Sequence, residues 1–517
     1  MKKVLALIVP VLLASGCSNA LQEEDAQMKW SKEQAFVEDV NSRVYYEIFV
    51  RAFADGDGDG IGDLKGATEK LDYLQELGVN GIWLMPINPS PSYHGYDVTD
   101  YKAIHPEYGS VEDMKVFVEE AHKRDIEVIM DFVMNHSSYD HPWFQKALAG
   151  DETYRDYYVW SDETTNLNQV GDWHQPVWHG DGEPKYEGVF WHGMPDMNFA
   201  NPQVMDEFKD ASAFWLEEVG LDGFRLDAAK YLYSSYQIEN HHDENVALWS
   251  DFSEHVESVK PGSMLVGEVW DSASIVGQYL QGLDSGFNFD LSARLLSAVQ
   301  QERDTGIASS LEKVRSHFAS VTDSYVDSTF LSNHDMDRVM SQLNGNEEHA
   351  KMAASLLLTL PGNPYLYYGE EVGLEGMKPD EHIREPMIWK KEKSAEETSW
   401  IDRVYSTDRE KVAVESQLKN EHSLLLHYKE QVAVRRSHRV LMDGEVAVSD
   451  VKQDGLVTFE RVLDDETLLV LHNVSGEEVD VEKPAEWNSL YYHSNGLNEE
   501  NESLTLPPYS TVIYSKE

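Results

Sequence analysis

Gly223-Phe-Arg-Leu-Asp-Ala-Ala-Lys230 is the segment from which the fold and the chemistry of this chain are best approached. Arg225 stands two residues before Asp227, so on an extended strand both side chains point to the same face. A cation that close holds a carboxylate ionised, as a nucleophilic or charge-stabilising carboxylate requires. An isolated Arg-x-Asp pair is more often a structural ion pair, so the segment gains meaning only from its surroundings.

The segment belongs to a series in which apolar, β-branched runs alternate with helical patterns. The runs predicted as buried parallel strands are Val44–Val50, Gly81–Met85, Glu127–Val133, Leu221–Asp227, Met264–Val269, Thr329–Ser332 and Pro364–Tyr368, with a further one near Gly286–Asp290. Between them lie helices such as Ser110–Lys123, where Ser110 can cap and Asp113 takes the capping-box position. Seven or eight such units predict an α/β fold, a (β/α)₈ TIM barrel with its active site at the carboxyl ends of the strands.

Two features interrupt this series. Roughly ninety residues separate the third and fourth strands, far more than one helix requires, which predicts an inserted domain, called domain B here. Near the carboxyl end of the chain, short alternating strands predict an antiparallel β-sandwich. The expected division is a signal segment at 1–17, a tether at 18–35, a barrel at 36–135 and 202–433, domain B at 136–201 and the sandwich at 434–517.

The first seventeen residues have the pattern of a bacterial export signal. Lys2 and Lys3 precede the apolar run Val4–Leu13, which is too short for a permanent membrane anchor. The small residues that follow lead to Cys17, the only cysteine of the chain, and resemble the lipobox of lipoproteins. We therefore expect export and a lipid on Cys17 as the only membrane contact of a protein that is otherwise a monomer.

The charge of the chain excludes one class of partner. It has 42 Lys and Arg against 93 Asp and Glu, a formal net charge of −51. Phosphate backbones would be repelled, so nucleic acid is not expected as a partner. A neutral substrate is unaffected, and the acidity itself is interpreted as a contribution to solubility.

Candidate chemical groups follow successive predicted strands. The segments are Asp131–His136, then Arg225 with Asp227, then Glu268 with Trp270, then Ser332–Asp335. Glycoside hydrolysis needs one carboxylate that stays ionised and another that can hold a proton. Arg225 marks Asp227 as the ionised group, whereas apolar residues and Trp270 beside Glu268 would raise its pKa towards use as a general acid.

These segments resemble the conserved regions of the α-amylase family, glycoside hydrolase family 13, in order and approximate spacing. Met194–Asn198 is similar to a further region of that family, which lies in domain B. The resemblance implies a retaining, double-displacement mechanism. Asp227 would be the nucleophile, Glu268 the general acid/base and Asp335 the stabiliser of the transition state.

The resemblance also implies the residues that hold the sugar in the cleavage subsite. Tyr96 would stack under the ring and Lys230 would lie across the scissile bond. The full predicted set is His94, Tyr96, Asp97, His136, Arg225, Lys230, His334 and Arg384.

A separate acidic loop predicts a calcium ion. Asp55-Gly-Asp-Gly-Asp-Gly-Ile-Gly-Asp63 resembles the first half of an EF-hand loop, but Gly66 stands where that motif needs a glutamate. Several members of the family bind Ca²⁺ in this first barrel loop, which implies Asp55, Asp57, Asp59, Asp63 and the carbonyl of Ile61 as ligands. A second calcium at Asn135 is common in amylases, and because Tyr231 stands here where many have a histidine, the resemblance leaves that site open.

Two residues bear on specificity. Ala228 follows the nucleophile where relatives that cleave α-1,6 bonds usually have valine, and Tyr93 stands where exo-acting α-glucosidases usually have aspartate. We therefore expect endo-hydrolysis of α-1,4 bonds in starch, glycogen and maltooligosaccharides. The alternatives are an exo-acting α-glucosidase or cyclomaltodextrinase, a 4-α-glucanotransferase, and a non-catalytic starch-binding or transporter-associated protein.

Overall fold

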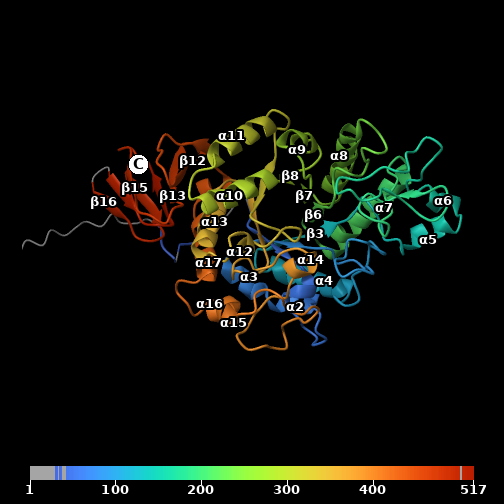
Figure 1. Ribbon diagram of the computed structural model, residues 1–517, viewed down its shortest axis with the longest axis horizontal. Coiled ribbons are helices and arrows are strands. Elements are labelled where there is room, and N and C mark those ends of the chain that lie inside the picture. Colours follow the sequence, from blue (N-terminus) through green and yellow to red (C-terminus); the bar gives the residue numbers. More distant parts are fainter. Residues whose placement is uncertain (1–29, 33, 38–41, 501–502, 517) are drawn as a thin grey trace, which may run out of the picture.

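The computed structural model describes residues 30–516 except 33, 38–41 and 501–502, so Cys17 and the predicted signal segment lie outside the described residues. A closed barrel of parallel strands forms the centre of the molecule (Figure 1). Its strands are β1 (Tyr45–Ile48), β2 (Gly81–Leu84), β3 (Glu127–Phe132), β6 (Gly223–Leu226), β7 (Met264–Gly267), β8 (Ser285–Phe287), β9 (Val326–Phe330) and β10 (Asn363–Tyr367). The predicted TIM barrel is confirmed, including the strand expected near Gly286.

Helices follow the strands and cover the outside of the barrel. In α4 (Val111–His122), Ser110 and Asp113 form the predicted capping box, and the buried face consists of Met114, Phe117, Val118 and Ala121. The other longer helices are α2 (Leu64–Glu69), α3 (Leu71–Leu77), α7 (Pro202–Ala213), the π-helix η1 (Phe214–Val219), α8 (His241–Val259), α9 (Ala273–Tyr279), α10 (Phe289–Gln301), α11 (Ile307–Phe318), α13 (Glu347–Thr359) and α17 (Leu424–Arg436). Shorter helices are α1 (Val50–Phe53), α12 (Val339–Gln342), α14 (Asp380–Ile383), α15 (Arg409–Val412), α16 (Val414–Gln417) and α18 (Arg439–Asp443).

Aromatic side chains fill the inside of the barrel. The rings of Tyr45 and Tyr365 stack with centroids 4.8 Å apart, and Trp83 contacts Phe287 at 5.4 Å. These residues share one buried cluster with Ile129, Val266 and Phe330. Because the interior is packed, a ligand can reach only the mouth of the barrel.

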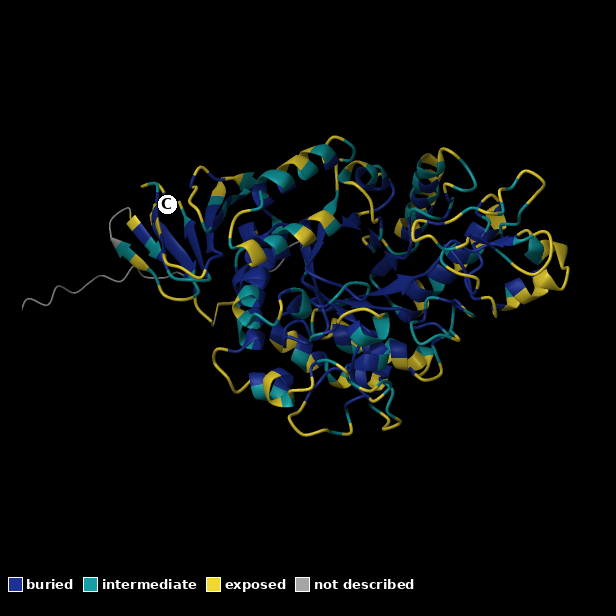
Figure 2. Ribbon diagram, in the orientation of Figure 1, coloured by how far each residue is buried: buried dark blue, intermediate teal, exposed yellow. Residues whose placement is uncertain are grey.

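The excursion between β3 and β6 lies at the end of the molecule opposite the sandwich (Figure 1). It contains α5 (Pro142–Leu148), α6 (Glu152–Arg155) and the two-residue strands β4 (Trp178–His179) and β5 (Tyr186–Glu187). Single bridges join His136 to Asp196 and Tyr158 to Met197, so both ends of the excursion are tied together. Its outer part around α6 is exposed, whereas the barrel strands are buried apart from the partly exposed first residues of β3, β7 and β9 (Figure 2).

The carboxyl-terminal part forms the predicted β-sandwich. One sheet has the order β11 (Glu445–Val448), β12 (Leu456–Leu463), β13 (Glu466–Asn473), β18 (Ser510–Ser515) and β15 (Ser489–His493). The other contains β14 (Val479–Glu482), β17 (Ser503–Leu506) and β16 (Asn498–Glu500). The strand pairings of the described residues in both sheets are antiparallel.

Two buried arginines, one from the sandwich and one from the barrel, bind the end of a barrel helix. Arg461 on β12 donates to the carbonyls of Thr359 and Gly444, and Arg435 on α17 donates to the carbonyls of Leu358 and Leu360. The last carbonyls of a helix have no partner within the helix and carry a partial negative charge. The two guanidinium groups therefore close the end of α13. None of the helices among the described residues is long and apolar enough to span a membrane.

Candidate active site

A cavity of about 970 Å³ opens at the mouth of the barrel, between its loops and the inserted excursion. Most of the predicted catalytic and substrate-binding side chains line it, namely His94, Tyr96, His136, Asp227, Lys230, Glu268, Asp335 and Arg384. Arg225 and His334 are buried against these lining groups rather than in the wall itself. The structure therefore brings together residues that lie far apart in the sequence.

Arg225 is the centre of a buried ion cluster. Its Nη1 lies 2.7 Å from Asp227 Oδ1 and 2.7 Å from Asp131 Oδ1, while its Nη2 lies 2.9 Å from Glu268 Oε2. The pairing of β3 with β6 sets Asp131 opposite Arg225, and the pairing of β6 with β7 ends with Leu226 opposite Gly267. Parallel register thus places the carboxylates of three strands on one guanidinium.

The electrostatics of this cluster differ from the simple pair expected from the sequence. Burial raises the pKa of Asp227 and of Glu268, and Arg225 opposes the rise in both. Burial also raises the pKa of Asp131 to about 7. One cation cannot keep three buried carboxylates ionised, so the cluster can hold a proton.

The source of the raised pKa of Glu268 also differs from expectation. Trp270 does not enclose the carboxyl: its ring is 52% exposed and stacks on Phe289 with centroids 4.4 Å apart. Both contacts of Glu268 use Oε2, which accepts from Arg225 and from the backbone N–H of Ala228 at 3.1 Å. A proton on Oε1 would therefore leave these contacts undisturbed.

The backbone beside Asp227 helps to shape the site. Ala228 has a φ of 49°, in the left-handed region that non-glycine residues seldom adopt. This conformation accompanies the hydrogen bond from its N–H to Glu268. A β-branched residue would be disfavoured there, which gives a physical reason for a small side chain at this position.

Asp335 lies in a second set of charges across the cavity. His334 Nε2 is 3.1 Å from Asp335 Oδ2, and Arg384 Nη2 is 3.0 Å from Asp335 Oδ1. Burial raises the pKa of Asp335, but His334 and Arg384 outweigh it and lower that pKa far below its usual range. Asp335 is therefore the carboxylate that stays ionised most firmly.

The remaining predicted sugar contacts are placed unequally. The Tyr96 ring stacks against His334, with centroids 5.6 Å apart, and Lys230 Nζ donates to the carbonyl of Trp270 at 3.0 Å. His136 lies behind Tyr96, with its Nε2 3.2 Å from the Tyr96 carbonyl. Asp97 is not brought into this cavity, because its carboxylate accepts from the hydroxyls of Ser90 and Ser92.

The acidic loop after α1 gathers three of its four carboxylates. Asp55, Asp57 and Asp63 each place an oxygen within 4.8 Å of the others. Gly58 and Gly60, with φ of 90° and 94°, allow the turns between them. Asp59 is outside this group, and its carboxylate accepts the N–H of Ile61 at 2.7 Å. Oxygen donors converging in this way suit a hard cation such as Ca²⁺.

Several residues of the site were not singled out as site residues in the sequence. Asp131 and Glu47 lie within segments predicted from the sequence, but neither they nor Asp380 are among the predicted site residues. Glu47 is a charged residue inside the buried strand Tyr45–Ile48, and a charge in such a strand indicates a paired or functional side chain. Asp380 is the first residue of the short helix α14, which no strand pattern would place, and it contacts Arg384 at 3.4 Å.

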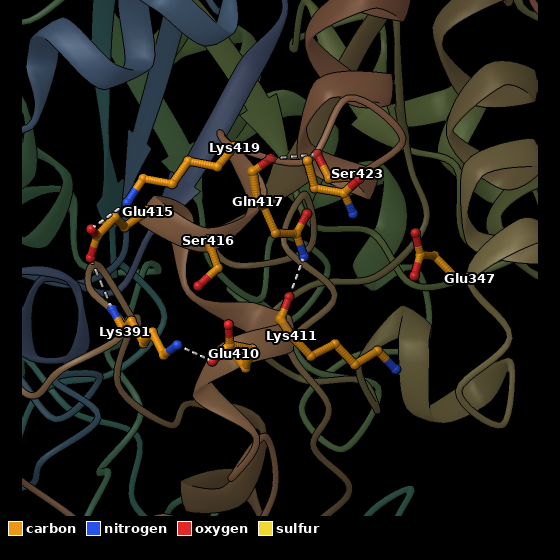
Figure 3. A pocket seen from close by; sticks show the side chains of 10 residues that line it. Glu347, Lys391, Glu410, Lys411, Glu415, Ser416, Gln417, Lys419 and Ser423 are labelled. Carbon is orange, nitrogen blue, oxygen red and sulfur yellow. Dashed lines mark hydrogen bonds and ion pairs between the residues drawn. The ribbon is translucent and has the colours of Figure 1, made fainter.

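The molecule has a second hollow, of about 390 Å³ (Figure 3). Its walls come from α13, α15, α16 and the start of α17, away from the ends of the barrel strands. Figure 3 shows that four of its charged side chains form ion pairs, Lys391 with Glu410 and Lys419 with Glu415. Among the residues that line it, no two carboxylates share one guanidinium, as Asp227 and Glu268 do at the barrel mouth.

Comparison with known proteins gives the same result as the geometry. Residues 47–444 match the family described as "Alpha amylase, catalytic domain", and residues 456–513 match the "Alpha-amylase SusG C-terminal domain". The first match covers more than half of the chain and contains every predicted catalytic residue.

Individual relatives extend this similarity over most of the chain. "Alpha-amylase 3" of Dictyoglomus thermophilum is 41% identical over 91% of this chain and 92% of its own length. A "4-alpha-glucanotransferase" of Thermotoga neapolitana is 36% identical over 84% of this chain and 96% of its own. The crystal structure of the α-amylase from H. orenii superposes with a TM-score of 0.86 at 41% identity, over 92% of this chain and 99% of that one.

Proposed function

Because the chain belongs to the α-amylase family of glycoside hydrolases, we propose that it cleaves internal α-1,4-glucosidic bonds of starch, glycogen and maltooligosaccharides. The observation that carries this proposal is the single guanidinium that binds Asp227 and Glu268 within 3 Å through different nitrogens. Carboxylates held so close to each other fit retention, for which a separation of about 5–5.5 Å is typical.

The first half of the reaction forms a covalent sugar–enzyme bond. Asp227 Oδ1 accepts from Arg225, which leaves Oδ2 to attack the anomeric carbon. As that bond forms, the bond to the glycosidic oxygen breaks and Glu268 gives its proton to the leaving oxygen. Positive charge develops on the sugar ring, and the ionised Asp335 stabilises it from across the cavity.

The second half releases the sugar. Glu268, now ionised, takes a proton from water as the water oxygen bonds to the anomeric carbon and displaces Asp227. Two displacements at one carbon restore the original configuration. Tyr96, stacked on His334, would present a flat apolar ring to the sugar during both steps.

Endo-action is supported by the shape and lining of the cavity. Trp173, Trp191 and Trp270 line it with 59%, 40% and 52% of their surfaces exposed, so aromatic faces are available beyond the catalytic carboxylates. Tyr93 stacks on Trp400 with centroids 5.3 Å apart, so an aromatic ring occupies the position where exo-acting relatives have a carboxylate. A long glucan could therefore extend past the reacting unit.

Transfer to another sugar is the second candidate, because the Thermotoga relative carries the name of a glucanotransferase. Both reactions share the glycosyl–enzyme intermediate, and they differ in whether water or a sugar accepts the glycosyl group. The same exposed tryptophans that would bind a substrate chain could also bind an acceptor.

A product time course tests the proposal. With soluble starch we expect mixed maltooligosaccharides at the earliest times and a rapid fall in iodine staining, because internal cleavage shortens chains before it releases small sugars. Pullulan should be cleaved more slowly, and Asp227→Asn protein serves as the blank. Glucose as the sole early product would overturn endo-action, and longer oligosaccharides formed from pure maltotriose would favour the transferase.

We also propose that the acidic loop binds Ca²⁺ through Asp55, Asp57 and Asp63, with Asp59 and the Ile61 carbonyl as further ligands. Three carboxylates within 4.8 Å repel one another, and a cation between them would offset that repulsion. EDTA should therefore lower the melting temperature, with a loss of about 3 kcal/mol if the free ion is near 100 times its Kd. Asp57→Asn should shrink the EDTA effect. Unchanged metal content and melting temperature after EDTA would contradict the proposal.

We further propose that the protein is exported, attached to the membrane by a lipid on Cys17, and otherwise monomeric. The support is the basic start, short apolar run and small residues before Cys17. Cys17→Ser protein should leave the membrane fraction, and retention there would argue against the lipid.

A further inference from the structure

The side chain of His334 is held between two carboxylates. Its Nδ1 contacts Glu47 Oε1 and its Nε2 lies 3.1 Å from Asp335 Oδ2. The side chains of His334 and Glu47 are 0% and 1% exposed, so solvent does not screen the interaction between their charges. Glu47 comes from β1 and is not among the residues that touch the cavity.

The hydrogen-bond pattern determines where the protons must be. A neutral imidazole has one N–H, so between two carboxylates one ring nitrogen would face an acceptor with its lone pair. The Tyr96 hydroxyl lies 2.6 Å from Nε2 and donates its own hydrogen to Asp131 Oδ2, so towards His334 it acts as an acceptor. Both ring nitrogens therefore face acceptors.

We propose that Glu47 is a positioning residue that keeps His334 as a doubly protonated imidazolium, so that the ring can orient Asp335 and Tyr96 for catalysis. The inference rests on the proposed hydrolase function of the site. In this arrangement a fully buried carboxylate on β1 acts on the reaction only through His334.

The surrounding charges agree with this arrangement. Burial lowers the pKa of His334, but Asp335 and Glu47 outweigh burial and raise it to about 10. The cations nearby are already bound, Arg225 to Asp131 and Asp227 and Arg384 to Asp335 and Asp380. The other titratable groups that face the pair are Tyr96, Asp131, Asp227, Tyr367 and Glu370.

Replacing Glu47 by Gln should change the pH profile rather than only its height. Glutamine keeps the volume but removes one of the two charges that hold the proton on His334, so the ring should deprotonate at lower pH. α-Maltosyl fluoride is the substrate, because fluoride leaves without the proton of Glu268 and the titration of Glu268 does not mask that of His334. We expect the alkaline limb of kcat/KM to move down by about one pH unit, a tenfold loss on that limb.

The matched control is Glu371→Gln. Glu371 is also a fully buried glutamate near the barrel, but its partners are the hydroxyls of Tyr46 and Tyr73 rather than His334. This variant should keep the wild-type profile shape. A Glu47→Gln profile that runs parallel to that of the wild type at every pH would overturn the proposal.

A second measurement does not depend on activity or on the stability of a variant at position 47. In wild-type protein labelled with ¹⁵N-histidine, the His334 resonances are identified by their loss in His334→Asn protein. At pH values above the usual histidine pKa of about 6.5, both ring nitrogens should still carry protons. One unprotonated ring nitrogen would overturn the assignment. Failure of all variants and wild type to release fluoride would instead count against the proposed function.

Discussion

Asp227→Asn protein is expected to lose about 10⁴-fold or more in kcat on starch, because an amide cannot form the covalent bond to the sugar. The fold should survive. Burial raises the pKa of Asp227, which means that its charge is unfavourable where it lies, and Arg225 would keep Asp131 and Glu268 as partners. The melting temperature should therefore be unchanged or slightly higher, and Asp100→Asn on an exposed turn controls for the amide substitution itself.

The role of Asp227 can be separated from a general loss of the site by chemical rescue. Asp227→Ala leaves a space beside the anomeric carbon that a small anion such as azide can enter. With α-maltosyl fluoride, azide should restore turnover and give the β-azide, because only one displacement occurs. A variant that retains more than roughly a hundredth of wild-type activity without azide would contradict the assignment.

Arg225→Met should damage both stability and activity. Removing one partner of a buried ion pair costs about 3–5 kcal/mol, and here three carboxylates lose their shared cation. Without Arg225 their folded-state pKa values rise further above the unfolded values, so the folded protein binds more protons. The free energy of unfolding should then fall as pH rises, so the variant should be less stable at about pH 8 than at about pH 5.

A double variant tests this explanation. Arg225→Met with Asp131→Asn removes one of the stranded charges, so part of the lost melting temperature at the higher pH should return. Equal losses at both pH values, together with simple additivity in the double variant, would show that Arg225 acts through packing and not through charge.

Local patterns were enough to predict the elements that carry this site. The apolar runs before Asp131, Asp227 and Glu268 are barrel strands, and the Ser110 capping box begins α4. The carboxyl ends of the strands in a parallel barrel meet at one mouth, so the sequence alone predicts that the catalytic carboxylates lie close together.

What the sequence could not predict is how charges are shared. That Arg225 binds Asp131 and Glu268 as well as Asp227 depends on the register between three strands. The contact of Glu47 with His334 joins residues 287 positions apart, and no spacing rule reaches that far. Asp97 is predicted as a sugar ligand because it follows Tyr96, but its carboxylate accepts hydrogen bonds from the hydroxyls of Ser90 and Ser92.

The contact of Arg461 on β12 with the end of α13 has a consequence for how the two domains can evolve. Arg461 leaves the sandwich and satisfies carbonyls that the barrel cannot satisfy for itself. A recombination event that replaced the sandwich with an unrelated module would leave those carbonyls buried without a hydrogen-bond donor. The two domains are therefore expected to be inherited as a pair, and chimaeras should tolerate only a replacement that brings an arginine to the same place.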